Sequence, residues 1–144
     1  MDLRARLEQQ FCERRRRNSR YSLRGFARSL GMHHSVLSQI LQRRRRLTAR
    51  TIQRIGTRIG LTAHEIRDCC LAEHCDAILA MLGDPRFRAD ARWLAMMAGI
   101  TLIDVQAALH WLLYTGRLSM RSPSTWTTET LHGQPGRTLA DHLA

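Results

Sequence analysis

The chain has 144 residues, of which 23 are Arg, none is Lys and 12 are acidic, and its formal net charge is +11. A chain of this length forms one domain or two small ones. Its longest apolar run, Leu94 to Ile100, is too short to span a bilayer and its first residues are charged, so we expect a cytoplasmic protein with neither a membrane segment nor a secretory signal.

The positive charge is concentrated in the first part of the chain. Residues 1–60 contain sixteen Arg and three acidic residues, a net charge of +13, whereas residues 61–144 contain seven Arg and nine acidic residues, a net charge of −2. This asymmetry is typical of a nucleic-acid-binding domain joined to a partner domain. Arg suits phosphate because its planar guanidinium donates two hydrogen bonds at once.

Residues 2–17 are predicted to form a first helix. Leu3, Leu7 and Phe11 fall on one face, and Asp2 is placed to cap the start. Arg14 to Arg17 lie at the end, where positive charge suits the helix dipole.

Two short helices are predicted next, one running from its N-cap Ser22 to Leu30 and one over residues 34–42. Counted from Leu23, the fourth, eighth, tenth, fifteenth and eighteenth positions are apolar: Phe26, Leu30, Met32, Leu37 and Ile40. These positions face inward when two short helices cross steeply. Ala27 falls at the helix contact and Gly31 at the turn, where a positive φ is needed. The pattern predicts a helix-turn-helix; a plain amphipathic helix pair is the alternative, and it leaves the flanking arginines unexplained.

A basic connection, Arg43 to Arg46, leads to two further predicted helices. Thr48 caps a helix over residues 49–59, whose buried side carries Ile52, Ile55 and Ile59 and which Gly60 ends. A capping box, Thr62 to Glu65, opens a fifth helix.

Residues 2–74 resemble the DNA-binding domain of the lambda repressor and Cro superfamily, also called Xre-like. The segments YSLRGFARSLGMHHSVLSQIL and LTARTIQRIGTRIGLTAHE, separated by the short basic turn, follow helices two to five of that domain. The resemblance implies a mainly α protein whose residues 1–75 form a five-helix DNA-binding domain. Many relatives carry a Gly-containing turn after the reading helix, where this chain has Gln42 and four Arg.

In a helix-turn-helix the start of the second helix reads base edges in the major groove. The residues expected in that role are His33, His34, Ser35, Ser38 and Gln39. Gln pairs bidentately with adenine, while Ser and His are adaptable partners. For Ser35, helix capping or phosphate contact is an equal alternative, and for Gln39 the alternative is a solvated face.

Phosphate contacts are expected from residues that flank the predicted helix-turn-helix. Arg43 to Arg46 are four clustered like charges, whose repulsion a polyanion removes. A second cluster comprises Arg14 to Arg17, Arg20 and Arg24. The residues predicted to contact phosphate are Ser22, Arg24, Gln42, Arg43, Arg44, Arg45, Arg46, Arg17 and Arg20. Arg50, Arg54 and Arg58 form a stripe at spacing four, for which a solvated face is an equal alternative.

The second half repeats the apolar pattern. Counted from Ala91, the inward positions are Leu94, Ala98, Ile100, Val105 and Ala108, the small contact is Ala95 and the turn is Gly99. Helices are predicted over residues 76–82, 91–98 and 102–114, the last with Thr101 as its N-cap and Asp104 three residues on. A strand over 116–120, a turn over 122–124 and a return strand over 126–128 follow. Residues 76–128 thus resemble a winged-helix domain, and residues 129–144 are predicted to be a flexible tail.

The joint architecture resembles a poorly characterised bacterial family that pairs an Xre-like helix-turn-helix with a C-terminal winged helix. The reading helix of the second domain offers Ile103, Asp104, Gln106, Ala107 and His110, which make a poor DNA surface because they include no Arg and one acid. Trp93, Trp111 and Trp126 are expected to pack the small core, with one of them exposed at an interface as the alternative.

The four cysteines are expected to be reduced thiols. Cys69, Cys70, His74 and Cys75 invite a zinc interpretation, but their spacing is not that of paired C-x-x-C ligands and all four fall in a predicted helix. Buried or half-buried thiols are the favoured interpretation, with a redox-sensing Cys69–Cys70 pair as the alternative. The sequence predicts no cofactor, no metal and no catalytic arrangement, hence no enzyme.

The sequence therefore predicts a sequence-specific, double-stranded-DNA-binding transcription regulator, a repressor, acting at the nucleoid of a bacterium or encoded by a phage. It would be a homodimer through residues 76–128, or would bind an accessory protein there. Two alternatives stay open: an antitoxin or adaptor with autoregulatory DNA binding, and a non-specific binder of RNA or DNA.

Overall fold

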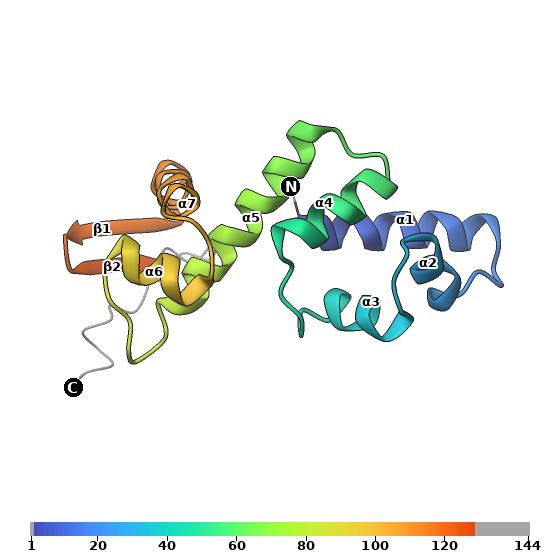
Figure 1. Cartoon of the computed structure of the whole chain (residues 1–144), viewed down its shortest axis with the longest axis horizontal. Coiled ribbons are helices and arrows are strands. Elements are labelled where there is room, and N and C mark those ends of the chain that lie inside the picture. The colour runs from blue at the N-terminus through green and yellow to red at the C-terminus, as the bar shows by residue number, and fades with distance from the viewer. Residues whose placement is uncertain (1, 129–144) are drawn as a thin grey trace. The chain divides into compact units, whose positions relative to one another are not determined.

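The computed structural model describes residues 2–128. This part of the chain is mainly helical, with seven helices and one two-stranded antiparallel sheet (Figure 1). The chain divides into two compact units, Met1–Cys70 and Leu71–Ala144. The division lies within one helix, α5 (Ala63–Met81), as does the boundary predicted between residues 75 and 76. The predicted flexible tail lies outside the described residues.

Unit 1 contains α1 (Leu3–Arg17), α2 (Leu23–Ser29), α3 (His34–Leu41), α4 (Ala49–Arg58) and the first turns of α5. The helix starts follow the capping predictions. The side chains of Asp2, Ser22 and Thr48 accept hydrogen bonds from backbone N–H groups in the first turns of α1, α2 and α4. Thr62 and Glu65 form the predicted capping box at the start of α5. Local side-chain chemistry thus sets where each helix begins.

The core of unit 1 is assembled from the apolar faces of all five helices. Phe26, Leu30, Leu37 and Ile40 are at most 1% exposed, as their spacing predicted, and Met32 packs against the cluster while partly buried. The core also contains Leu3, Leu7, Ala27, Leu47, Ile52, Ile55, Leu61 and Cys69. The ring of Phe11 stacks on that of the core residue Phe26, with centroids 5.6 Å apart.

Two glycines are needed in unit 1, one for its backbone conformation and one for its small size. Gly31 lies between α2 and α3 with φ +68°, the left-handed conformation predicted for the turn. Gly56 is buried in the middle of α4, where an added Cβ would lie 2.8 Å from Cγ1 of Ile66 on α5. That close approach of α4 and α5 leaves no room for a larger residue.

The helix predicted over residues 76–82 is wrong as a separate element, because residues 76–81 form the end of α5. α5 is 19 residues long and has no internal break. Its sequence contains no Gly or Pro between Ala63 and Leu82, so nothing terminates the helix at the predicted domain boundary. Its first part carries Ile66 and Cys69 into the core of unit 1, and its last part carries Cys75 and Ile78 into the core of unit 2.

Unit 2 adds α6 (Ala91–Ala98), α7 (Leu102–Tyr114) and a hairpin of β1 (Leu118–Ser122) and β2 (Thr125–Thr128). Both helices have the predicted bounds. Gly99 ends α6 with φ +66°, and Thr101 and Asp104 form a capping box on α7. In the hairpin Leu118 pairs with Thr128 and Met120 with Trp126, with an irregularity between Met120 and Ser122. The first strand lies two residues later than the sequence predicted.

The core of unit 2 gathers side chains from every element. It consists of Cys75, Ile78, Leu82, Leu94, Val105, Ala108, Leu112, Leu118 and Trp126. Phe87 contacts both Trp126 and the half-buried Trp93, with ring centroids 5.6 and 5.9 Å apart. The expectation that all three tryptophans pack in the core is wrong for Trp111, which is 46% exposed. Trp111 lies beside the buried stripe of α7, and the alternative of one exposed tryptophan describes this chain.

Among the described residues, no single helix is long and apolar enough to cross a membrane. α6 and α7 reach that length and composition only when taken together, and they are bent by 111° at the break between them.

Candidate nucleic-acid interface

The segment from α2 to α3 is a rigid pair of short helices. Ser22 Oγ accepts from the Gly25 N–H at 3.1 Å to start α2, and the Met32 N–H donates to the Ala27 carbonyl at 3.1 Å across the turn. Ala27 is fully buried where the pair meets, as predicted. The exposed side of α3 is therefore held by the core beneath it.

The five residues predicted to read bases all lie at the start or on the outer side of α3. His33, Ser35 and Gln39 are exposed, whereas His34 and Ser38 are half-buried. The Gln39 side chain makes no hydrogen bond to another side chain among the described residues, so its amide is available to a ligand. Gln42 Nε2 donates to Ser38 Oγ at 3.3 Å. The structure brings a row of hydrogen-bonding side chains to one helix face and buries Leu37 and Ile40 on the other.

The start of α3 is capped by a histidine rather than by Ser35. The Ser35 N–H donates to Nδ1 of His33 at 3.3 Å, and Ser35 Oγ lies 2.7 Å from the same nitrogen. Nδ1 of His33 accepts from the Ser35 N–H, as an N-cap group does. Ser35 is thus oriented by His33 and has its hydroxyl on the surface of the first turn.

The rings of His33 and His34 lie 4.3 Å apart, centroid to centroid, beside Arg24 on α2. Partial desolvation, followed by repulsion from His33 and Arg24, holds the pKa of His34 below its ordinary value. The two histidines, Arg24, Arg28 and Met32 line a hollow of about 450 Å³. The lining of this hollow thus combines two arginines with a histidine that is harder to protonate than usual.

The loop after α3 is tightly bonded. The Arg44 N–H donates to the Gln39 carbonyl at 2.9 Å, and Arg43 has φ +58°, in the left-handed region where glycine is favoured. Glycine adopts this conformation without a steric cost, whereas here an arginine occupies it. Arg43 Nη2 also contacts Asp2 Oδ2 at 2.7 Å, so the loop is joined to the start of α1.

Arg4 is the residue of this site that the sequence analysis missed. Its side chain is buried on α1, where Nε donates to the Ile40 carbonyl at 3.0 Å and Nη2 to the Arg45 carbonyl at 3.2 Å. It satisfies backbone carbonyls at the end of α3 and in the loop beyond it. One signal was available: Arg4 lies three residues before Leu7, on the apolar face of the first helix.

The second predicted cluster of arginines has two different environments. Arg14 lies over the Phe26 ring at 5.2 Å and donates to Tyr21 Oη at 2.9 Å and to Ser29 Oγ at 3.1 Å. It therefore connects α1 to α2. By contrast Arg17, Arg20 and Arg24 are exposed on the surface.

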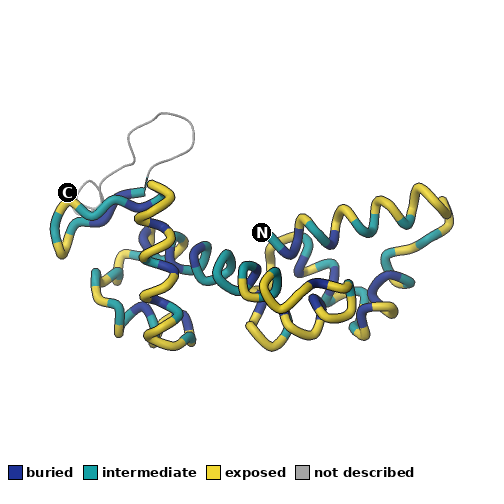
Figure 2. Tube along the Cα trace, turned by 90° about the horizontal axis from the view of Figure 1, so that it is seen from above, coloured by how far each residue is buried: buried dark blue, intermediate teal, exposed yellow. Residues whose placement is uncertain are grey.

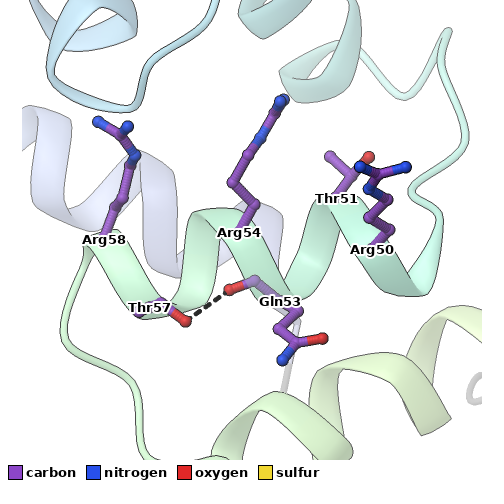
Figure 3. Close-up of a pocket in the computed structure, with 6 residues that line it drawn as sticks. All are labelled: Arg50, Thr51, Gln53, Arg54, Thr57 and Arg58. Carbon is purple, nitrogen blue, oxygen red and sulfur yellow. Dashed lines mark hydrogen bonds between the residues drawn. The ribbon is translucent and has the colours of Figure 1, made fainter.

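Arg50, Arg54 and Arg58 project from the same side of α4, as Figure 3 shows. With Thr51, Gln53 and Thr57 they line a hollow of about 530 Å³. Arg58 reaches the turn after α2, where Nη1 donates to the Ser29 carbonyl at 3.4 Å and the guanidinium lies against Gly31. The stripe predicted from spacing four is present, with one member engaged in packing.

The cysteines of α5 lie in the two cores. Cys69 and Cys75 are buried and Cys70 is half-buried, while Cys12 on α1 is exposed. Burial raises the pKa of Cys75 to about 11 and also raises the pKa of Cys69, which keeps both as thiols at neutral pH. Within residues 2–128 no group of three His, Cys, Asp or Glu side chains is arranged to hold a metal ion.

Comparison of the chain with models of protein families, with curated proteins and with solved structures finds no match. The chemistry of the surface described above is therefore the basis for assigning a function. It consists of a polar helix face, a loop with four arginines that buried hydrogen bonds hold in place, and further exposed arginines on α1 and α2.

Proposed function

We propose that the protein is a sequence-specific, double-stranded-DNA-binding transcription regulator of a bacterium or phage. In this proposal α2 and α3 form a helix-turn-helix of the Xre-like kind and α3 enters the major groove. Unit 2, with α6, α7 and the hairpin, is a winged helix that joins two copies of the chain. No metal or cofactor takes part, and the protein has no enzymatic role.

The observation that carries the proposal is the arrangement around α3. Its outer face presents Ser35, Ser38 and Gln39, while the loop directly after it carries Arg43 to Arg46 and is held by Arg4. Base edges are read by such polar side chains, and phosphates on either side are contacted by Arg. If α3 only faced solvent, there would be no need for a buried guanidinium to hold the loop that follows it.

The distribution of charge supports DNA as the partner. Residues 1–70 contain seventeen Arg and five acidic residues, a net charge of +12, whereas residues 71–128 contain five of each. A positive surface of this strength binds a polyanion through release of its counterions. The neutral unit then remains available for contacts between proteins.

The test begins with selection of bound sites from random duplex DNA by the full chain. A recurring sequence is expected, and binding that is equally tight to unrelated duplexes or to RNA would replace the proposal by a non-specific binder. The selected duplex then serves to test individual residues.

Gln39→Ala is expected to lose about 1–3 kcal/mol of binding free energy on the selected duplex and much less on an unrelated one. Arg44→Ala should weaken binding to both duplexes alike, because phosphates carry no sequence information. Gln53→Ala is the matched control, since this exposed Gln lies on α4 and outside the proposed reading helix. If Gln39→Ala behaves like Gln53→Ala, α3 is not the reading helix.

A further inference from the structure

α7 is apolar on nearly every side. Its thirteen residues include a single charged side chain, Asp104, whose carboxylate accepts from Thr101 Oγ1 at 2.7 Å in the capping box. One side of the helix buries Val105, Ala108 and Leu112 in unit 2. A helix that is apolar all round is normally covered all round, yet exposed residues recur along α7 (Figure 2).

The exposed side of α7 carries large apolar groups at helical spacing. Ile103 is 76% exposed and Tyr114 is 78% exposed, with the small Ala107 between them. The ring of Tyr114 lies 6.0 Å from that of Trp111, centroid to centroid, so the two aromatics form one surface. Gln106 and His110 are the polar residues beside this row, and neither carries a fixed charge.

The exposed area matches one side of a protein interface. Seven large apolar side chains on α6 and α7 are exposed: Met96, Met97, Leu102, Ile103, Trp111, Leu113 and Tyr114. If each is given about the 150–250 Å² of an aromatic side chain, their exposed fractions together amount to roughly 800 Å², summed over both helices and more than one side of α7. Each partner in a standard interface contributes about 800 Å² of polar and apolar surface together, so this area is enough for the apolar centre of an interface.

We infer that this surface pairs with the same surface of a second copy of the chain, through antiparallel α7 helices related by a two-fold axis. A two-fold contact brings identical patches together, so a patch without net charge avoids placing like charges opposite one another. α7 contains no Lys or Arg, and residues 71–128 have equal numbers of Arg and acidic residues. A membrane-surface helix, by contrast, carries basic residues on its polar face.

In the antiparallel pair, Ile103 lies next to the partner's Tyr114 and Ala107 lies near the axis, where its small side chain lets the helices approach. Pairing of two chains through this surface does not depend on DNA binding. The use of the pair, which is to hold two α3 helices on one operator, rests on the proposed function.

The first test is sedimentation velocity of the full chain without DNA. The wild-type protein is expected at twice the chain mass of 16.6 kDa at micromolar concentration. Ile103→Glu should be monomeric with unchanged helicity by circular dichroism. Ser124→Glu, which places the same charge in the exposed turn of the hairpin, should remain dimeric.

A mixing experiment tests the antiparallel geometry. Tyr114→Arg alone should also weaken the dimer, but an equimolar mixture of Ile103→Glu and Tyr114→Arg chains should form a heterodimer. In that heterodimer the introduced carboxylate at position 103 of one chain faces the introduced guanidinium at position 114 of the other. At the second contact, the unchanged Tyr114 of the first chain faces the unchanged Ile103 of the second. Failure of the mixture to associate would overturn the antiparallel pairing.

Further outcomes separate this inference from the proposed function. A wild-type protein that is monomeric at all concentrations, an Ile103→Glu variant that remains dimeric, or binding to neutral lipid vesicles that Ile103→Glu abolishes would each overturn the inference. A dimer that binds no duplex DNA would overturn the proposed function alone. Ile103→Glu should still bind a single half-site as tightly as the wild type, because α3 is untouched.

Discussion

Arg43 combines an unfavourable backbone conformation with a charge at the proposed DNA surface. A φ of +58° costs a residue with a Cβ about 1–2 kcal/mol, whereas Gly adopts it freely. Part of this advantage is lost because Gly has more conformational freedom in the unfolded chain, by about 0.5–1 kcal/mol. We therefore expect Arg43→Gly to have a free energy of unfolding about 0.5–1 kcal/mol higher than Arg43→Ala, measured by urea denaturation.

Arg44 provides the matched control for the backbone effect, because Arg43 is the one non-glycine residue with positive φ in the described chain. At position 44 the order should reverse, with Arg44→Ala more stable than Arg44→Gly. All four variants remove one positive charge and should weaken DNA binding to a similar degree. The same order at both positions would show that the loop conformation is not as described.

His34 should make DNA binding depend on pH. In the free protein, desolvation, His33 and Arg24 lower its pKa below 6.5, so the folded chain takes up this proton less readily than the unfolded chain. Its contribution to the free energy of unfolding therefore decreases as pH falls below about 6.5. The negative potential of bound DNA favours the imidazolium, so binding takes up a proton and the Kd of the complex should fall between pH 7.5 and pH 5.5.

The measurement is the Kd for the selected duplex at pH 7.5, 6.5 and 5.5. His34→Asn should remove most of the pH dependence, and His110→Asn on α7 should retain it. If His34→Asn keeps the wild-type pH dependence, the proton is taken up elsewhere and His34 does not face the phosphates.

At the scale of the residue, the sequence predicts what depends on near neighbours. Asp2, Ser22, Thr48, Thr62 and Thr101 cap the helices as expected, since each cap bonds to a residue two or three positions away. The role of Arg4 could not be predicted in this way, because its acceptors lie 36 and 41 residues along the chain. The same holds for the contact of Arg43 with Asp2, which only the folded chain brings together.

At the scale of the element, the packing of α4 against α5 depends on Gly56. An Ala there gains about 1 kcal/mol of helix propensity but places its Cβ 2.8 Å from Cγ1 of Ile66. Overpacking of this kind costs about 1–3 kcal/mol. We expect Gly56→Ala to lower the free energy of unfolding by about 1 kcal/mol, as measured by urea denaturation.

Gly25 on α2 is the control for Gly56, because a Cβ there meets its nearest atom at an ordinary 3.5 Å. Gly25→Ala should therefore stabilise the protein by up to about 1 kcal/mol. Equal effects at the two positions would mean that α4 and α5 are not in close contact.

Helix ends were predictable where a terminating residue is present. Gly60 and Gly99, both with positive φ, follow α4 and α6 where the sequence placed them. The predicted break before residue 76 is wrong, because α5 has no Gly or Pro to end it there. A helix that supplies both units has two apolar stretches in succession, which a periodicity analysis interprets as two helices.

At the scale of the whole molecule, charge separates the two proposed tasks. Unit 1 carries the arginines proposed to contact DNA, and its net positive charge repels a second copy of itself in the absence of DNA. The described part of unit 2 is neutral and presents the apolar surface of α6 and α7. Dimerisation through unit 2 should therefore depend weakly on salt, while DNA binding depends on it strongly.

This division predicts two different salt slopes. If each copy neutralises about six phosphates, the logarithm of affinity for a single half-site should fall with the logarithm of salt concentration with a slope of about −5. A duplex with two half-sites one helical turn apart engages both copies of the dimer, so the slope should approach about −10. Ile103→Glu should give the single-site slope on both duplexes, because its copies bind independently. Titrations over a range of NaCl concentrations measure these slopes, and equal slopes for the wild type on the two duplexes would show that the dimer does not place two α3 helices on one operator.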